Sequence, residues 1–111
     1  MAVLELWQAE WCPHSHKVRQ RLTELGLDFV GRQVPAERDD RDELAAATGC
    51  RGIPTLVCAD FRGRREVLSG EEQIIPWLDR YFDERPDAAR HRARARAEVR
   101  LFDEVEDLVH G

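Results

Sequence analysis

The stretch WCPHS at residues 11–15 contains the residue types of a thiol-based reaction centre. A cysteine attacks as its thiolate, and the unpaired N–H groups and positive dipole end of a helix start favour that form. Pro13 is typical of the first helical position, where its missing N–H would have no partner. The pattern predicts that Cys12 lies at a helix start with a pKa below that of a free thiol. Lys17 and Arg19 on the same helix can add positive charge.

Ser15 follows Cys12 by three residues, the spacing at which a second thiol would break a mixed disulfide from within the molecule. Its hydroxyl can donate a hydrogen bond to the Cys12 thiolate, but it cannot displace a disulfide. Exchange at Cys12 must therefore follow a monothiol route, in which a second small thiol releases the enzyme.

The two remaining cysteines, Cys50 and Cys58, complete an odd set with no C-x-x-C pair. This argues against a secreted disulfide framework and against a zinc-ligand set, so we expect no metal ion. Cys50 lies shortly before Ile53 and Pro54, and a role as a distant resolving thiol stays open. Cys58 falls in a predicted strand, where we expect it to pack as a small apolar side chain.

Hydrophobic periodicity and turn residues predict the elements that position these side chains. We expect strands at residues 2–7, 27–34, 53–60 and 66–70 and helices at residues 13–25, 36–49 and 69–82, with Ser69 capping the last helix. The first strand–helix–strand unit implies a parallel pair with a right-handed crossover, and the last two strands imply a hairpin. The predicted fold class is α/β, with a mixed four-stranded sheet flanked by helices on both faces.

A further helix is predicted at residues 87–111, so we divide the chain into a domain at 1–83 and a helical extension at 84–111. Arginines in the first half of this helix fit either an RNA-binding arm or a solvated helix with internal ion pairs. The net acidity of the chain and the lack of interleaved aromatic residues favour the second interpretation. An apolar stripe from Val99 to Val109 either packs back on the domain or pairs with a second subunit, so monomer and homodimer both stay open.

The whole composition fits one domain: the chain has 111 residues, of which 42% are hydrophobic and 35% charged. The formal net charge of -5 argues against partners such as nucleic acid or an anionic membrane surface. The chain has no apolar run of about 18 residues and no basic, signal-like N-terminus, so we expect a cytoplasmic protein.

Three segments carry a resemblance to known families: CPHSHKVRQRLTELGLDF from residue 12, the Ile53-Pro54-Thr55 triplet, and SGEEQIIPWL from residue 69. Together they resemble the thioredoxin-like fold over about residues 2–82, and more narrowly the glutaredoxins and the N-terminal domain of glutathione transferases. The resemblance implies glutathione, or another low-molecular-weight thiol, as co-substrate and glutathionylated proteins as partners.

The resemblance also implies roles for individual residues. Pro54 would be the cis-proline that faces Cys12, and Ile53 would pair its backbone with the cysteinyl part of glutathione. The other binding residues would be Pro13 beside the cysteine and Glu71 and Glu72 at the start of the last core helix, where the γ-glutamyl end is held.

His14 has two open interpretations. By resemblance to oxidases with a Pro-His dipeptide, it stabilises the thiolate through charge or a hydrogen bond. Otherwise it is an exposed polar residue of the first turn.

Two departures from the glutaredoxin pattern bear on the function. Ala9 stands where many glutaredoxins have the cation for the glycine carboxylate, and Arg51 or Gln8 could substitute for it. The motif also lacks the Gly-Phe of glutaredoxins that share an iron–sulfur cluster, although a cluster bridged by two Cys12 thiolates stays open.

The predicted function is that of a monothiol glutaredoxin-like thiol–disulfide oxidoreductase acting through Cys12, with His14 and Ser15 beside it. Two alternatives stay open: a binding or conjugating module like the glutathione transferase N-terminal domain, and a non-catalytic thioredoxin-like interaction domain.

Overall fold

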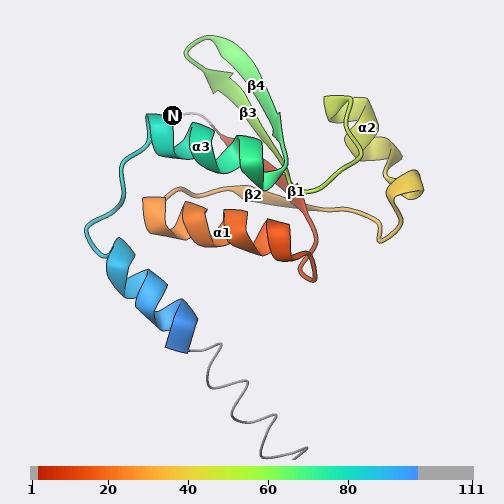
Figure 1. Ribbon diagram of the computed structural model, residues 1–111. Helices are drawn as coiled ribbons and strands as arrows, with labels where there is room; N and C mark the ends of the chain where they lie inside the picture. Colours follow the sequence, from red (N-terminus) through yellow and green to blue (C-terminus); the bar gives the residue numbers. More distant parts are fainter. Residues whose placement is uncertain (1–2, 98–111) are drawn as a thin grey trace, which may run out of the picture.

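In the computed structural model, which describes residues 3–97, one mixed sheet has helices on both faces (Figure 1). Its elements are β1 (Leu4–Gln8), α1 (Pro13–Leu25), β2 (Val30–Gln33), the 3-10 turn η1 (Arg38–Asp40), α2 (Asp42–Thr48), β3 (Thr55–Phe61), β4 (Arg64–Ser69) and α3 (Glu71–Tyr81). The strand order is β2-β1-β3-β4. β1 runs parallel to β2, and β3 runs antiparallel to β1 and β4. The predicted fold class is confirmed.

The two faces of the sheet carry separate apolar clusters, because alternate side chains of a strand point to opposite faces. On one face Leu6 and Leu56 pack with Leu22 of α1 and Ile74 of α3. On the other face Trp7, Leu44 of α2 and Val57 form a smaller cluster. Cys58 is completely buried in the larger cluster, as expected, and burial raises the pKa of its thiol. The helices α1 and α3 therefore cover one face of the sheet, and α2 covers the other (Figure 1).

The helix predicted at residues 36–49 is wrong in its first half: the chain forms η1 and then the shorter α2. Arg41 separates the two with a non-helical backbone (φ -86°, ψ 53°). Its buried guanidinium donates hydrogen bonds of 2.9 to 3.0 Å to the carbonyls of Pro35, Ala36 and Arg51. These three bonds satisfy loop carbonyls that would lie out of reach of the Arg41 guanidinium if the helix were continuous. They therefore explain the break in the helix.

The cap predicted for the last core helix is also wrong. Ser69 ends β4, and its hydroxyl lies 3.0 Å from the hydroxyl of Thr55 on β3. Gly70 takes the cap position with φ 87°, a conformation that favours glycine. The Gly70 N–H donates to the carbonyl of Pro54 at 2.8 Å, so this corner is fixed to the loop before β3.

The extension helix begins at residue 88 and joins the end of α1 through charged side chains. Arg92 bridges Glu24 at 3.0 Å and Glu84 at 2.8 Å. Arg21 bridges the same two carboxylates at 2.7 Å and also bonds Asp79 of α3 at 2.7 Å. We call these five residues the charge clamp. The predicted apolar stripe from Val99 to Val109 lies outside the described residues.

None of the helices within residues 3–97 has both the length and the apolar character needed to span a membrane. Within the same range, no group of three or more His, Cys, Asp and Glu side chains is arranged to hold a metal ion.

Candidate active site

Cys12 occupies the N-cap of α1, immediately before Pro13 at the first helical position. Its side chain is only 6% exposed, and the Ser15 backbone N–H donates to Sγ at 3.4 Å. The sulfur therefore receives one of the helix N–H groups that have no partner inside the helix. This is the placement that the sequence predicts for Cys12 and Pro13.

The local environment lowers the pKa of Cys12 below its ordinary value. Burial raises the pKa, but hydrogen bonds from the Ser15 hydroxyl, the Ser15 amide and the His14 amide, together with the charge of Arg19, outweigh it. The Ser15 hydroxyl is fully buried and has no well-aligned partner among the described residues. A thiolate at Cys12 would give this hydroxyl the acceptor that it otherwise lacks.

The two predicted cations, Arg19 and Lys17, have different partners. Arg19 is held against the end of β1 by a hydrogen bond to Gln8 and a 3.3 Å ion pair with Glu10, and its charge favours the thiolate. Lys17 instead points to Glu71, with Nζ 3.5 Å from the carboxylate.

The Ile53–Pro54 peptide bond is cis, and Pro54 is completely buried. Trp7 of β1 pairs with Thr55 of β3, so the loop that follows β1 and the loop that precedes β3 leave the same edge of the sheet. The first loop leads to Cys12 and the second contains Pro54. The Ile53 N–H and C=O have no hydrogen bond within the described residues, so they are free to pair with an extended ligand.

The two glutamates at the start of α3 have different partners. Glu71 contacts the His14 ring through Nδ1 and also Lys17, and the hydrogen bond from His14 is the main reason why the pKa of Glu71 lies below its ordinary value. Glu72 has no ion pair within residues 3–97. Its carboxylate folds back over Gly70, so closely that a Cβ at residue 70 would clash with Oε1. The His14 side chain is therefore directed to α3, whereas its backbone N–H serves the cysteine.

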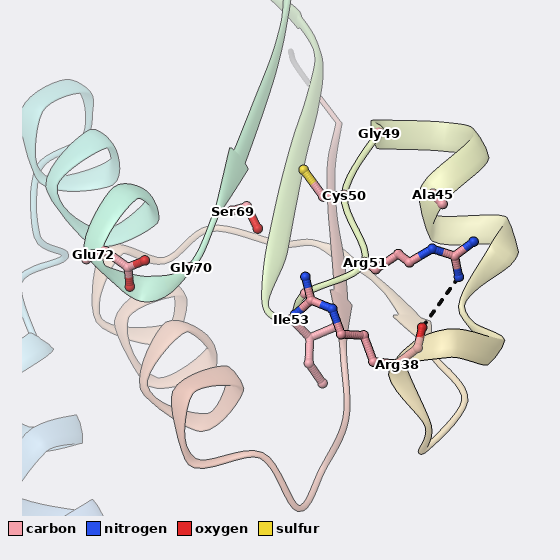
Figure 2. A pocket seen from close by; sticks show the side chains of 10 residues that line it. Arg38, Ala45, Gly49, Cys50, Arg51, Ile53, Ser69, Gly70 and Glu72 are labelled. Carbon is pink, nitrogen blue, oxygen red and sulfur yellow. Dashed lines mark hydrogen bonds between the residues drawn. The ribbon is translucent and has the colours of Figure 1, made fainter.

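A pocket of about 620 Å³ lies between the start of α3 and the η1–α2 segment (Figure 2). Glu72 and Gly70 line it on the α3 side, and Arg38 lines it on the η1 side, with Ile53 between them. The pocket thus has an acidic end and a basic end. Ten residues line it: Arg38, Ala45, Gly49, Cys50, Arg51, Gly52, Ile53, Ser69, Gly70 and Glu72.

Arg38 is the residue that sequence reasoning missed. Its guanidinium has no ion pair or hydrogen bond within residues 3–97 and lies against Gly52, where a Cβ would be 3.6 Å from Nη1. Arg51 also lines the pocket, but its guanidinium is bonded to Asp42 at 2.8 Å and to the Asp39 carbonyl at 3.0 Å. Residue type alone could not single out Arg38, because it is one of several charged residues near the start of the helix expected at 36–49.

The two side chains expected to replace the missing cation at Ala9 are both engaged elsewhere. Gln8 is buried, donates to Gln33 at 3.1 Å and accepts from Arg19. Arg51 is turned toward the segment that carries Arg38 (Figure 2). Among the described residues, the cation of the pocket without a side-chain partner is therefore Arg38. It lies on η1 and not on the loop after β1, where Ala9 stands.

Cys50 is partly exposed and lines the pocket. Cys12 is not among the residues that line it. All three cysteines are free thiols.

Comparison with known proteins places these features in a family. A family model described as Glutaredoxin matches residues 4–61, which is more than half of the chain. A comparison with curated proteins gives no match.

Similar solved structures include a delta-class glutathione transferase of Nilaparvata lugens, with 17% identity and a TM-score of 0.58; the alignment covers 77% of this chain and 38% of the other. Glutathione transferase Omega 2S of Trametes versicolor, in complex with 2,4-dihydroxybenzophenone, has 18% identity and a TM-score of 0.62, over 94% of this chain and 50% of the other. At such identities the likeness shows the fold. The present chain spans at most half the length of these structures.

Proposed function

Since this chain belongs to the glutaredoxin family, we propose that it is a monothiol thiol–disulfide oxidoreductase that acts on mixed disulfides of glutathione or a related small thiol. The observation that carries the proposal is the placement of Cys12. It is a helix N-cap with a lowered thiol pKa, beside a cis-proline loop, with Ser15 at the spacing of a second thiol. Such a site favours one thiolate and supplies no adjacent thiol to displace what it binds.

The exchange has two steps. The Cys12 thiolate attacks the glutathione sulfur of a protein–glutathione disulfide, so the protein–glutathione S–S bond breaks and a Cys12–glutathione disulfide forms. The released protein thiolate takes a proton from solvent. A second glutathione thiolate then attacks the bound glutathione sulfur, which forms oxidised glutathione and returns the Cys12 thiolate. Ser15 and the helix N–H groups stabilise that thiolate as the leaving group.

Groups in and beside the pocket support the binding of a γ-glutamyl tripeptide in three parts. The N–H groups of Glu71 and Glu72 have no partner within residues 3–97 and suit a carboxylate, while the Glu72 side chain suits the neighbouring ammonium. The free backbone groups of Ile53 suit the cysteinyl part. Arg38 suits the glycine carboxylate and takes the place of a cation at Ala9.

The test is a coupled assay in which a glutathionylated peptide is reduced by glutathione. We expect the wild type to be active, Cys12→Ser to fall to the background rate, and the matched control Cys50→Ser to keep most of the activity. Activity that survives Cys12→Ser would refute the assignment of the nucleophile. A loss in Cys50→Ser equal to that in Cys12→Ser would show a dithiol route instead.

A second candidate is a transferase-type module that activates the thiol of bound glutathione with a hydroxyl. The buried Ser15 hydroxyl, which lacks a well-aligned partner, is the observation in its favour. Conjugation of glutathione to 1-chloro-2,4-dinitrobenzene by the wild type and by Ser15→Ala distinguishes the two. Conjugation that depends on Ser15 and not on Cys12 would support the second candidate.

A further inference from the structure

The start of α3 carries two adjacent carboxylates, of which α1 neutralises one. Glu71 is paired with His14 and Lys17, both from the first turns of α1. Glu72 has no ion pair within the part of the chain that the structure describes, and it lines the pocket. The asymmetry separates a carboxylate committed to the protein from one available to a ligand.

An uncommitted Glu71 would interfere with ligand binding for a simple electrostatic reason. The backbone N–H groups of Glu71 and Glu72 have no partner within residues 3–97, and such groups attract any nearby carboxylate. A glutamate at the first helical position can itself approach them and repel an incoming carboxylate. A bound γ-glutamyl carboxylate therefore requires that the Glu71 side chain be held elsewhere.

We propose that His14 and Lys17 are positioning residues that hold the Glu71 carboxylate away from the N-terminal amides of α3 and thereby keep these amides open to the carboxylate of the thiol substrate. The inference rests on the proposed function and gives His14 a role at the binding site that is separate from any effect on the Cys12 thiolate. Because His14 and Lys17 both belong to α1, whose N-cap is Cys12, the same contacts also align the start of α3 with the cysteine.

The test is a double-mutant cycle with a ligand that cannot react. The affinity for S-methylglutathione is measured by calorimetry for the wild type, His14→Gln, Glu71→Gln and the double variant. We expect His14→Gln to weaken binding about fivefold in the presence of Glu71. In the Glu71→Gln background the same His14 substitution is expected to change the affinity less than twofold, because residue 71 then has no carboxylate for His14 to restrain. Lys17→Met, a second variant, should weaken binding in the same Glu71-dependent way.

The outcomes separate this inference from the proposed function. A wild type that binds S-methylglutathione, but in which His14→Gln weakens binding equally in both backgrounds, overturns the positioning role. An unchanged affinity in His14→Gln and in Lys17→Met overturns it as well. A wild type that does not bind the ligand overturns the proposed function and this inference together. Near-ultraviolet circular dichroism of each variant verifies that its side-chain packing is native.

Discussion

Ser15 is the residue on which the chemistry of Cys12 depends most directly. Its backbone N–H bonds Sγ at 3.4 Å, and its hydroxyl also favours the thiolate. A substitution by alanine keeps the first interaction and removes the second. The hydroxyl can therefore be tested separately from the helix start.

We predict that Ser15→Ala raises the pKa of Cys12 and lowers the exchange rate near neutral pH about threefold to tenfold. The sign follows because the lost hydrogen bond stabilised the charged form. The more basic thiolate that remains is also a better nucleophile, which limits the loss. Thiolate absorbance against pH measures the change. The rate difference should shrink above the pKa of both proteins, and an unshifted titration would contradict the prediction.

Arg38 and Arg51 form a matched pair of cations in the same pocket. Arg51 is bonded to Asp42 and the Asp39 carbonyl, whereas Arg38 has no partner within residues 3–97. We predict that Arg38→Gln raises KM for glutathione about tenfold with a small effect on kcat, because a charge-assisted contact to a carboxylate is lost. Arg51→Gln, as the control, should change KM much less. Steady-state kinetics measures both values, and equal effects would remove the special role of Arg38.

At the scale of elements, the charge clamp connects α1, α3 and the extension helix. The Glu24 side chain is only 7% exposed and is bonded by Arg21 and Arg92. Burial raises the pKa of Glu24, but the hydrogen bonds from Gln20, Arg21 and Arg92 outweigh it and lower the pKa below its ordinary value. Arg92 and Arg21 lower the pKa of Glu84 to about 2.

We predict that the clamp stabilises the protein at neutral pH and fails in acid. A carboxyl whose pKa is lower in the folded than in the unfolded chain stabilises the fold above its unfolded value, about 4.3, and this stabilisation disappears as the pH falls through the folded value. For Glu84 that window extends down to about pH 2. Arg92→Met should lower Tm by about 5 °C at pH 7 and by much less at pH 2.

The matched control for Arg92→Met is Arg90→Met, because Arg90 lies on the same helix, is exposed, and has no ion pair within residues 3–97. Thermal melts of both variants at the two pH values provide the comparison. Equal changes in Tm for the two variants would show that the clamp does not stabilise the fold.

The elements were largely predictable because local patterns determine them. The interval from Pro13 to Gly26 and its apolar spacing suffice for α1, whose predicted and observed bounds agree. The helix at 36–49 failed because Arg41 bonds three carbonyls from two loops, and no local pattern encodes such contacts. The prediction that Ser69 caps the last core helix was wrong because its hydroxyl is hydrogen-bonded to Thr55 on the adjacent strand.

The residues of the candidate site were predictable where a local motif marks them, and not where contacts between distant segments decide. Cys12, Pro54 and the glutamates of α3 were identified from motifs. The contact between His14 and Glu71 joins residues 57 positions apart and becomes visible only when α1 and α3 are packed side by side. Arg38 could not be distinguished from its charged neighbours in the sequence, because its position against Gly52 is seen only in the folded chain.

At the scale of the whole molecule, Cys12 and the charge clamp lie at opposite ends of α1. Cys12 is the N-cap of this helix and Glu24 lies in its last turn, about 18 Å away at 1.5 Å per residue. The extension continues from the clamp: the Arg85 N–H donates to the Glu24 carbonyl at 3.0 Å, and Ala88 is buried. The boundary predicted between residues 83 and 84 thus falls beside contacts that support the domain and far from the cysteine.

We therefore predict that a chain shortened to residues 1–83 is less stable but chemically competent. It loses Glu84, Arg92 and the cover of Ala88, so Glu24 keeps only Arg21 as an ionic partner, and Tm should fall clearly more than in Arg92→Met. The surroundings of Cys12 stay intact, so the pKa of its thiol and the exchange rate at a temperature well below Tm should match those of the full chain. Thermal melts, thiolate titration and the coupled assay test the three statements. A stable fragment with a shifted thiol pKa would contradict the separation, because it would mean that the extension acts on the cysteine and not on the fold.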